Sequence, residues 1–147
     1  MCNILFQISI ATPIWDSEDS YTMTMLIAYD GRANTEKALE YAIRNSVVYG
    51  ERLIVLTVIT KNAVSEIDVA HDNADKAVSR AKAGGADVQS IVESGQPDKV
   101  ILETAARFDC STIIVGRSSK TAFDRVIMGS VSNSIVANAK CTVIVVQ

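Results

Sequence analysis

Short apolar runs alternate with longer amphipathic stretches from Met23 onward, and this alternation constrains the fold more than any other feature. Five runs are short, apolar and mostly rich in β-branched residues: Met25–Tyr29, Leu53–Ile59, Val88–Val92, Thr112–Val115 and Thr142–Val146. Between them, apolar residues recur at helical spacing. Continuous apolar runs are typical of parallel strands that are buried on both faces. The order β-α-β-α-β-α-β-α-β therefore predicts an α/β domain with a five-stranded parallel sheet and helices on both faces.

The helical stretches carry start and stop residues. The first covers Thr35–Tyr49, with Thr35 as a suitable N-cap and Gly50 as its stop. The second covers Ser65–Ala83 and ends at two glycines. Pro97 suits the first turn of the third helix, and Gly129-Ser130 opens the fourth. These signals support the same order of elements.

Length and charge restrict the classes of protein to which the chain could belong. Its 147 residues suit one domain with a sizeable core. The net charge is -3, and no block rich in Lys or Arg is present, so a dedicated nucleic-acid binder or a polybasic membrane-surface protein is not supported. No apolar run is long enough to span a bilayer. We expect neither nucleic acid nor membrane as a partner.

The first 22 residues have no place in the alternating pattern. Their apolar run, Ile4–Ile10, lacks a preceding Lys or Arg and is followed by Pro13 and an acidic cluster, unlike a secretory signal. We predict that residues 1–22 form a poorly ordered N-terminal extension and that residues 23–147 form the domain.

The cysteines indicate a reducing compartment. The chain has three cysteines, Cys2, Cys110 and Cys141, and none of them are in C-x-x-C spacing. An odd number without that spacing fits neither a disulfide framework nor a zinc site. Cys110 and Cys141 adjoin apolar runs, where a buried thiol behaves as a small hydrophobic group. We therefore expect a cytoplasmic protein and assign no metal-ligating residues.

Two predicted strand ends carry residues suited to binding a ligand. Open α/β sheets bind ligands beyond the carboxyl ends of their strands. Asp30-Gly31 follows the first strand, and Gly116 follows the fourth, ahead of a serine-rich loop and Gly129-Ser130 at a helix start. Glycines, hydroxyls and a helix N-terminus together suit an anion. Gly-Ser pairs also cap ordinary helices, so this segment alone leaves both interpretations open.

The same segment resembles the universal stress protein family. Nucleotide-binding members carry Gly, two residues, Gly, nine residues and then Gly-Ser or Gly-Thr. Here the pattern starts at Gly116, has Ser119 at its second glycine, and ends at Gly129-Ser130. The resemblance covers Met25–Val146, from the strand ending in Asp30-Gly31 to the final Val145-Val146. It implies a flavodoxin-like (Rossmann-like) fold with strand order 3-2-1-4-5.

The resemblance also implies ATP as ligand, with Mg or Mn held through the phosphates. Asp30 would lie near the ribose, and Val58 and Val115 would line the adenine slot. The implied binding residues are Ala28, Tyr29, Asp30, Val58, Val115, Gly116, Ser118, Ser119, Gly129, Ser130, Val131 and Ser132. A homodimer through the last strand would cover an apolar edge, Thr142–Val146.

Three functions remain open at this point. The first is an ATP-binding universal stress protein that acts as a dimeric, nucleotide-responsive regulatory module. The second is a member without nucleotide that acts through protein contacts, which the departure at Ser119 favours. The third is a slow ATPase. The chain has no G-x-x-x-x-G-K-[ST] or G-x-G-x-x-G motif, and Asp30 is the one carboxylate well placed, so no catalytic residue is assigned.

Overall fold

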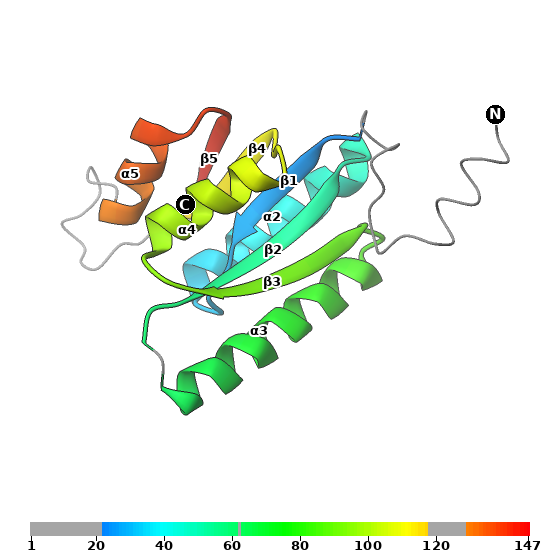
Figure 1. Ribbon diagram of the computed structural model, residues 1–147. Coiled ribbons are helices and arrows are strands. Elements are labelled where there is room, and N and C mark those ends of the chain that lie inside the picture. Colours follow the sequence, from blue (N-terminus) through cyan, green and yellow to red (C-terminus); the bar gives the residue numbers. More distant parts are fainter. Residues whose placement is uncertain (1–21, 62, 118–128) are drawn as a thin grey trace, which may run out of the picture.

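The computed structural model describes residues 22–61, 63–117 and 129–147 (Figure 1). Within them, five strands alternate with four helices, as the sequence predicts. The elements are β1 (Thr24–Ala28), α2 (Ala33–Tyr49), β2 (Arg52–Ile59), α3 (Val64–Ala83), β3 (Val88–Ser94), α4 (Pro97–Arg107), β4 (Thr112–Gly116), α5 (Ser130–Asn138) and β5 (Thr142–Val146).

The strands form one parallel sheet in the order β3-β2-β1-β4-β5, which confirms the predicted flavodoxin-like fold. In the register of the sheet, Ile27 of β1 lies beside Val55 of β2 on one side and Ile114 of β4 on the other. All three side chains are fully buried or nearly so. The continuous apolar runs therefore occupy the central strands, where both faces are covered.

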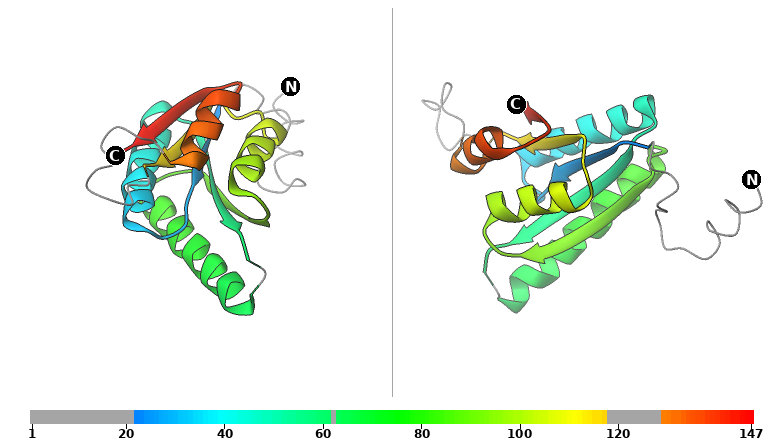
Figure 2. Two further views of the ribbon diagram at one scale, coloured as in Figure 1. Left: turned by 90° about the vertical axis from the view of Figure 1, so that its left-hand side faces the viewer. Right: turned by 45° about the horizontal axis from the view of Figure 1, so that its top comes forward.

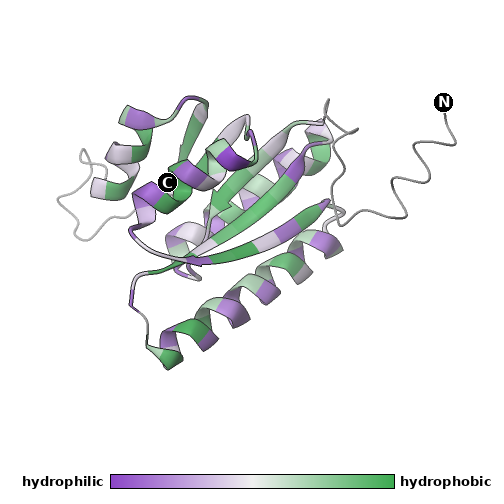
Figure 3. Ribbon diagram, viewed as in Figure 1, coloured by the Kyte–Doolittle hydropathy of each residue, from purple (hydrophilic) through white to green (hydrophobic). Residues whose placement is uncertain are grey.

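The helices cover the two faces of the sheet in pairs (Figure 2). Helices α2 and α3 pack on one face and α4 and α5 on the other. Successive strand residues alternate between two apolar clusters, as in β1, where Leu26 joins the cluster under α4 and α5 and Ile27 the one under α2 and α3. Figure 3 shows the strands apolar along most of their length and the helices mixed, as this two-sided burial requires.

The ends of α2 partly match their sequence signals. Gly50 caps the C-terminus in the left-handed region, with φ of 66°, as predicted. The predicted N-cap, Thr35, is wrong: the helix begins at Ala33 after Arg32, and Thr35 lies within its first turn. The Thr35 hydroxyl is instead within 2.9 Å of the Arg32 carbonyl and 2.8 Å of Asp30 Oδ1. Asp30 therefore accepts from the N-cap residue's backbone N–H and from the Thr35 hydroxyl, and no side chain caps the helix.

No helix in the described ranges is long and apolar enough to cross a membrane. The predicted extension, apart from Thr22, lies outside the described residues.

Candidate functional site

The carboxyl ends of β1 and β4 lie side by side at the centre of the sheet. From β1 the chain continues through α2 to β2 on one side, whereas β3 continues through α4 to β4 on the other side. This is the point of an open α/β sheet at which loops diverge and leave room for a ligand. Most of the predicted site residues that the structure describes lie at or near the ends of β1, β2 and β4 or at the start of α5.

Asp30 follows β1 and is held by the turn that leads into α2. Its Oδ1 accepts a hydrogen bond from the Arg32 backbone N–H at 2.9 Å and one from the Thr35 hydroxyl at 2.8 Å. Its Oδ2 is 3.4 Å from the Arg32 guanidinium Nε. The Asp30 side chain remains 46% exposed. One carboxylate oxygen is therefore used to build the turn, while the other faces outward.

Helix α3 also reaches this turn. Asn73 Nδ2 donates to the Asp30 carbonyl at 3.3 Å. The next residue, Gly31, has φ of 81°, and a Cβ there would come within 2.7 Å of the Asn73 amide. The turn therefore requires glycine both for its backbone conformation and for the close packing of Asn73. Sequence reasoning assigned no role to Asn73, which lies in a polar helix.

Tyr29 contributes its backbone rather than its ring to this edge. Its N–H donates to the Leu56 carbonyl at 2.9 Å, and its buried side chain points between α2 and α3. The hydroxyl donates to Glu36, which also pairs with Arg80 of α3. Burial first, and the hydrogen bond to Glu36 second, raise the pKa of Tyr29 to about 12. The ring thus ties β1 to both helices.

Four of the predicted apolar residues share one cluster. Val115 belongs to the buried cluster under α4 and α5, and Ala28, Val58 and Val131 pack against it while half-buried. They come from β1, β2, β4 and the first turn of α5. All four lie at or near the carboxyl ends of their strands or at the start of α5, at the end of the sheet where Asp30 follows β1.

Gly116 is required by packing within the protein. A Cβ at this position would lie 2.6 Å from the Asn34 carbonyl oxygen and 3.1 Å from the Thr35 backbone nitrogen. The end of β4 thus lies directly against the backbone of the first turn of α2. This contact explains the first motif glycine without a ligand.

The last motif residues open α5. Gly129 is the N-cap, with φ of -60° and ψ of 161°, and no side chain caps the helix. Ser130 is exposed, Val131 is half-buried and Ser132 is 4% exposed. The first N–H groups of a helix lack intrahelical partners and carry partial positive charge. This turn can therefore offer its first backbone N–H groups and the exposed Ser130 hydroxyl to an anion, whereas Ser132 is buried.

A hydrogen bond fixes the outer side of α5 to α4. The Ser134 hydroxyl donates to Asp98 Oδ2 at 2.6 Å. This hydrogen bond is the main reason that the pKa of Asp98 lies below its usual range.

Ser118 and Ser119, the two remaining predicted site residues, lie outside the described residues.

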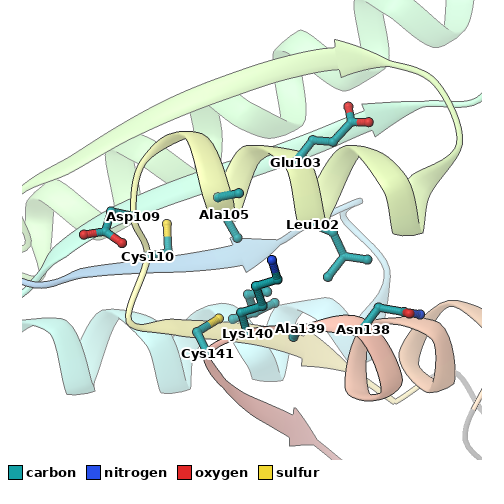
Figure 4. A pocket seen from close by; sticks show the side chains of 11 residues that line it. Leu102, Glu103, Ala105, Asp109, Cys110, Asn138, Ala139, Lys140 and Cys141 are labelled. Atoms are coloured by element: carbon teal, nitrogen blue, oxygen red, sulfur yellow. The ribbon is translucent and has the colours of Figure 1, made fainter.

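A cavity of about 450 Å³ lies away from this edge, between α4, α5 and the beginnings of β4 and β5 (Figure 4). Its lining includes Leu102, Cys110, Ile113 and Cys141 with Glu103 and Lys140. Burial raises the pKa of the Cys110 thiol to about 12 and that of Cys141 in the same direction, so both thiols stay protonated at neutral pH. The predicted role of Cys110 as a small apolar group is confirmed. The cavity lies at the amino ends of the strands, where none of the predicted ligand-binding residues lie.

Comparison with known proteins agrees with this architecture. The model of the Universal stress protein family matches residues 22–147. A curated protein of Staphylococcus aureus (strain USA300), whose name includes the words universal stress protein, is 32% identical over 139 residues. The match covers 84% of this chain and 82% of the relative.

Solved structures share the fold. The universal stress protein of Archaeoglobus fulgidus superposes with a TM-score of 0.77 at 21% identity, over 85% of this chain and 98% of that one. A universal stress protein from Archaeoglobus fulgidus in complex with dAMP gives a TM-score of 0.72 over the same shares and at the same identity. A universal stress protein in complex with cAMP gives 0.70 at 23% identity, over 86% of this chain and 97% of the other. The chain belongs to the universal stress protein family.

Proposed function

We propose that this protein binds ATP at the carboxyl edge of the sheet, between the ends of β1 and β4 and the start of α5. One observation carries the proposal: Val131, in the first turn of α5, packs on the same apolar cluster as Ala28, Val58 and Val115. In the proposed site, these apolar side chains lie between the Asp30 carboxylate and the N-terminus of α5. These are the three chemistries that a nucleotide needs: an apolar wall for the base, an acceptor for the sugar, and donors for the phosphates.

Each part of the nucleotide has a proposed partner. The adenine lies against Val58 and Val115, and the outward oxygen of Asp30 accepts from a ribose hydroxyl. The phosphates lie at Gly129 and Ser130, where the α5 N–H groups and a hydroxyl donate. The complexes of related proteins with cAMP and dAMP support an adenine nucleotide.

We propose that Mg or Mn enters with the phosphates. In residues 22–61, 63–117 and 129–147, no three His, Cys, Asp or Glu side chains are grouped as a metal site. The ion would neutralise phosphate charge.

With nucleotide bound or released, the protein would act as a cytoplasmic, nucleotide-responsive regulatory module.

Calorimetric titration with ATP and Mg tests the proposal. We expect a dissociation constant in the micromolar range or weaker, which corresponds to roughly 8 kcal/mol or less. Gly129→Val should abolish binding and leave the fold intact, because the backbone angles of Gly129 are open to any residue. The added side chain would instead obstruct the approach of phosphate to the N–H groups of α5.

A matched pair of charge substitutions separates a local effect from a general one. Asp30→Asn should weaken ATP about tenfold by removing the outward acceptor. Glu103→Gln removes the same charge at the opposite cavity and should leave the affinity unchanged. Equal weakening in both variants would contradict the assignment of Asp30. No heat with the unaltered chain would favour the second candidate, a scaffold that acts through protein contacts, which Ser119 supports.

We also propose a homodimer through β5, the edge strand. The Thr142 N–H donates to the Ser111 carbonyl, and the Val146 carbonyl accepts from the Arg117 N–H. The backbone groups of Thr142 and Val146 therefore face β4. Because strand residues alternate, the N–H groups of Val143 and Val145 face outward and can pair with a second β5. Val145→Pro removes an outward donor while sparing the pairing with β4. Sedimentation should give a dimer for the unaltered chain and a monomer for the variant, whereas a monomer for both would contradict the proposal.

A further inference from the structure

Thr35 lies in the first turn of α2, and its side chain is buried beside Asp30. It is 7% exposed. Its Oγ1 lies 2.8 Å from Asp30 Oδ1 and 2.9 Å from the Arg32 carbonyl, and it accepts from the Asp30 backbone N–H at 3.4 Å. A threonine hydroxyl has one hydrogen, which goes to one acceptor at a time. The same hydroxyl therefore contacts Asp30 at both its backbone and its carboxylate.

The two carboxylate oxygens of Asp30 have different hydrogen-bond partners. Oδ1 accepts hydrogen bonds from the Thr35 hydroxyl and the Arg32 backbone N–H, and both donors belong to the turn. Oδ2 contacts the Arg32 guanidinium at 3.4 Å, and the Arg32 side chain is 77% exposed. Such an exposed ion pair is weak and yields readily to a better donor. The turn thus presents Oδ2 to an incoming ligand.

The backbone of the turn is held independently. Asn73 donates to the Asp30 carbonyl from α3, and Gly31 supplies the left-handed conformation that follows. With the backbone held in this way, rotation of the carboxylate is the main freedom left to Asp30. The Thr35 hydroxyl is the one side-chain donor to Oδ1 among the hydrogen bonds described for this turn.

We infer that Thr35 is a positioning residue for nucleotide binding. Its hydroxyl holds the Asp30 carboxylate in the orientation in which Oδ2 accepts a ribose hydroxyl, and Thr35 itself does not touch the nucleotide. Holding a ligand group in its bound orientation beforehand lowers the cost of binding. This inference rests on the proposed binding of ATP.

Two variants isolate the hydroxyl. Thr35→Val has the same shape without the hydroxyl, and Thr35→Ser keeps the hydroxyl. With ATP, we expect Thr35→Val to weaken binding about three- to tenfold and Thr35→Ser to stay within about twofold. With 2′,3′-dideoxy-ATP, which lacks the ribose hydroxyls, all three proteins should bind alike. Equal weakening of both ligands by Thr35→Val, or no weakening of either, would overturn the inference.

Amide hydrogen exchange without nucleotide tests a second contact of the same hydroxyl, which accepts from the Asp30 backbone N–H. In Thr35→Val, the Asp30 amide loses its acceptor and should exchange faster, whereas the Tyr29 amide, bonded to Leu56, should not change. Thr35→Ala, a second variant without the hydroxyl, should behave in the same way. Unchanged exchange at Asp30 would show that the Thr35 hydroxyl does not contact Asp30 as described, and would overturn the inference. Faster exchange at Asp30 in a chain that binds no ATP would confirm the contact and refute the proposed function.

Discussion

Gly116→Ala should destabilise the protein even when no nucleotide is present. The added Cβ would lie 2.6 Å from the Asn34 carbonyl oxygen and 2.8 Å from its carbonyl carbon. Real Cβ contacts this short essentially never occur, so one of the two segments must move. Because the obstructing atoms belong to backbone, no change of side-chain rotamer relieves the contact.

The expected cost follows from the rigidity of both segments. The end of β4 is tied to β5 by the hydrogen bond from the Arg117 N–H to Val146, and Asn34 lies in the first turn of α2. Overpacking of this kind costs about 1–3 kcal/mol. For a domain of this size, the melting temperature should fall by about 2–4 °C for each kcal/mol.

Urea unfolding and calorimetric melting without nucleotide measure this cost. Lys37→Ala, at an exposed position of α2, is the control and should stay within about 0.5 kcal/mol of the unaltered chain. If Gly116→Ala unfolds like the unaltered chain, the packing argument is refuted. If its only defect is weaker ATP binding, the glycine serves the approach of the ligand instead.

Three further predictions concern other parts of the chain. Tyr29→Phe should lower the free energy of unfolding by about 1 kcal/mol. Between about pH 10 and 12, the native Tyr29 keeps a proton that the same residue loses in the unfolded chain, so the free energy of unfolding should fall as the pH rises through this range. Urea unfolding across the range should show a smaller fall for Tyr29→Phe. Ser119→Gly should tighten ATP about three- to tenfold in calorimetry, because serine brings a Cβ toward the phosphates; weaker binding would make the hydroxyl itself a ligand. A chain beginning at Met23 should melt within a few degrees of the full chain, and a large drop would mean that Ile4–Ile10 pack on the domain.

The order of the elements followed from the sequence because it depends on short-range patterns. The run Leu53–Ile59 is apolar at nearly every position, which suits a strand covered on both faces, and it lies within β2 in the interior of the sheet. Gly50 ends α2 in the left-handed conformation that its missing Cβ permits. Asp30, Val115 and Gly129 were also placed correctly at strand or helix ends, since such ends are marked by local residues.

The contacts that shape the candidate site were decided by the tertiary structure alone. Thr35 has the residue type of an N-cap, yet it holds Asp30, because the turn after β1 places that carboxylate above the first turn of α2. Tyr29 lies at a strand end near the site, but its ring turns away to Glu36. Asn73 and Gly116 act on segments far along the chain. For Asn73 and Gly116, local propensity carries no information about the partner, because only the packing of helices on the sheet brings the two segments together.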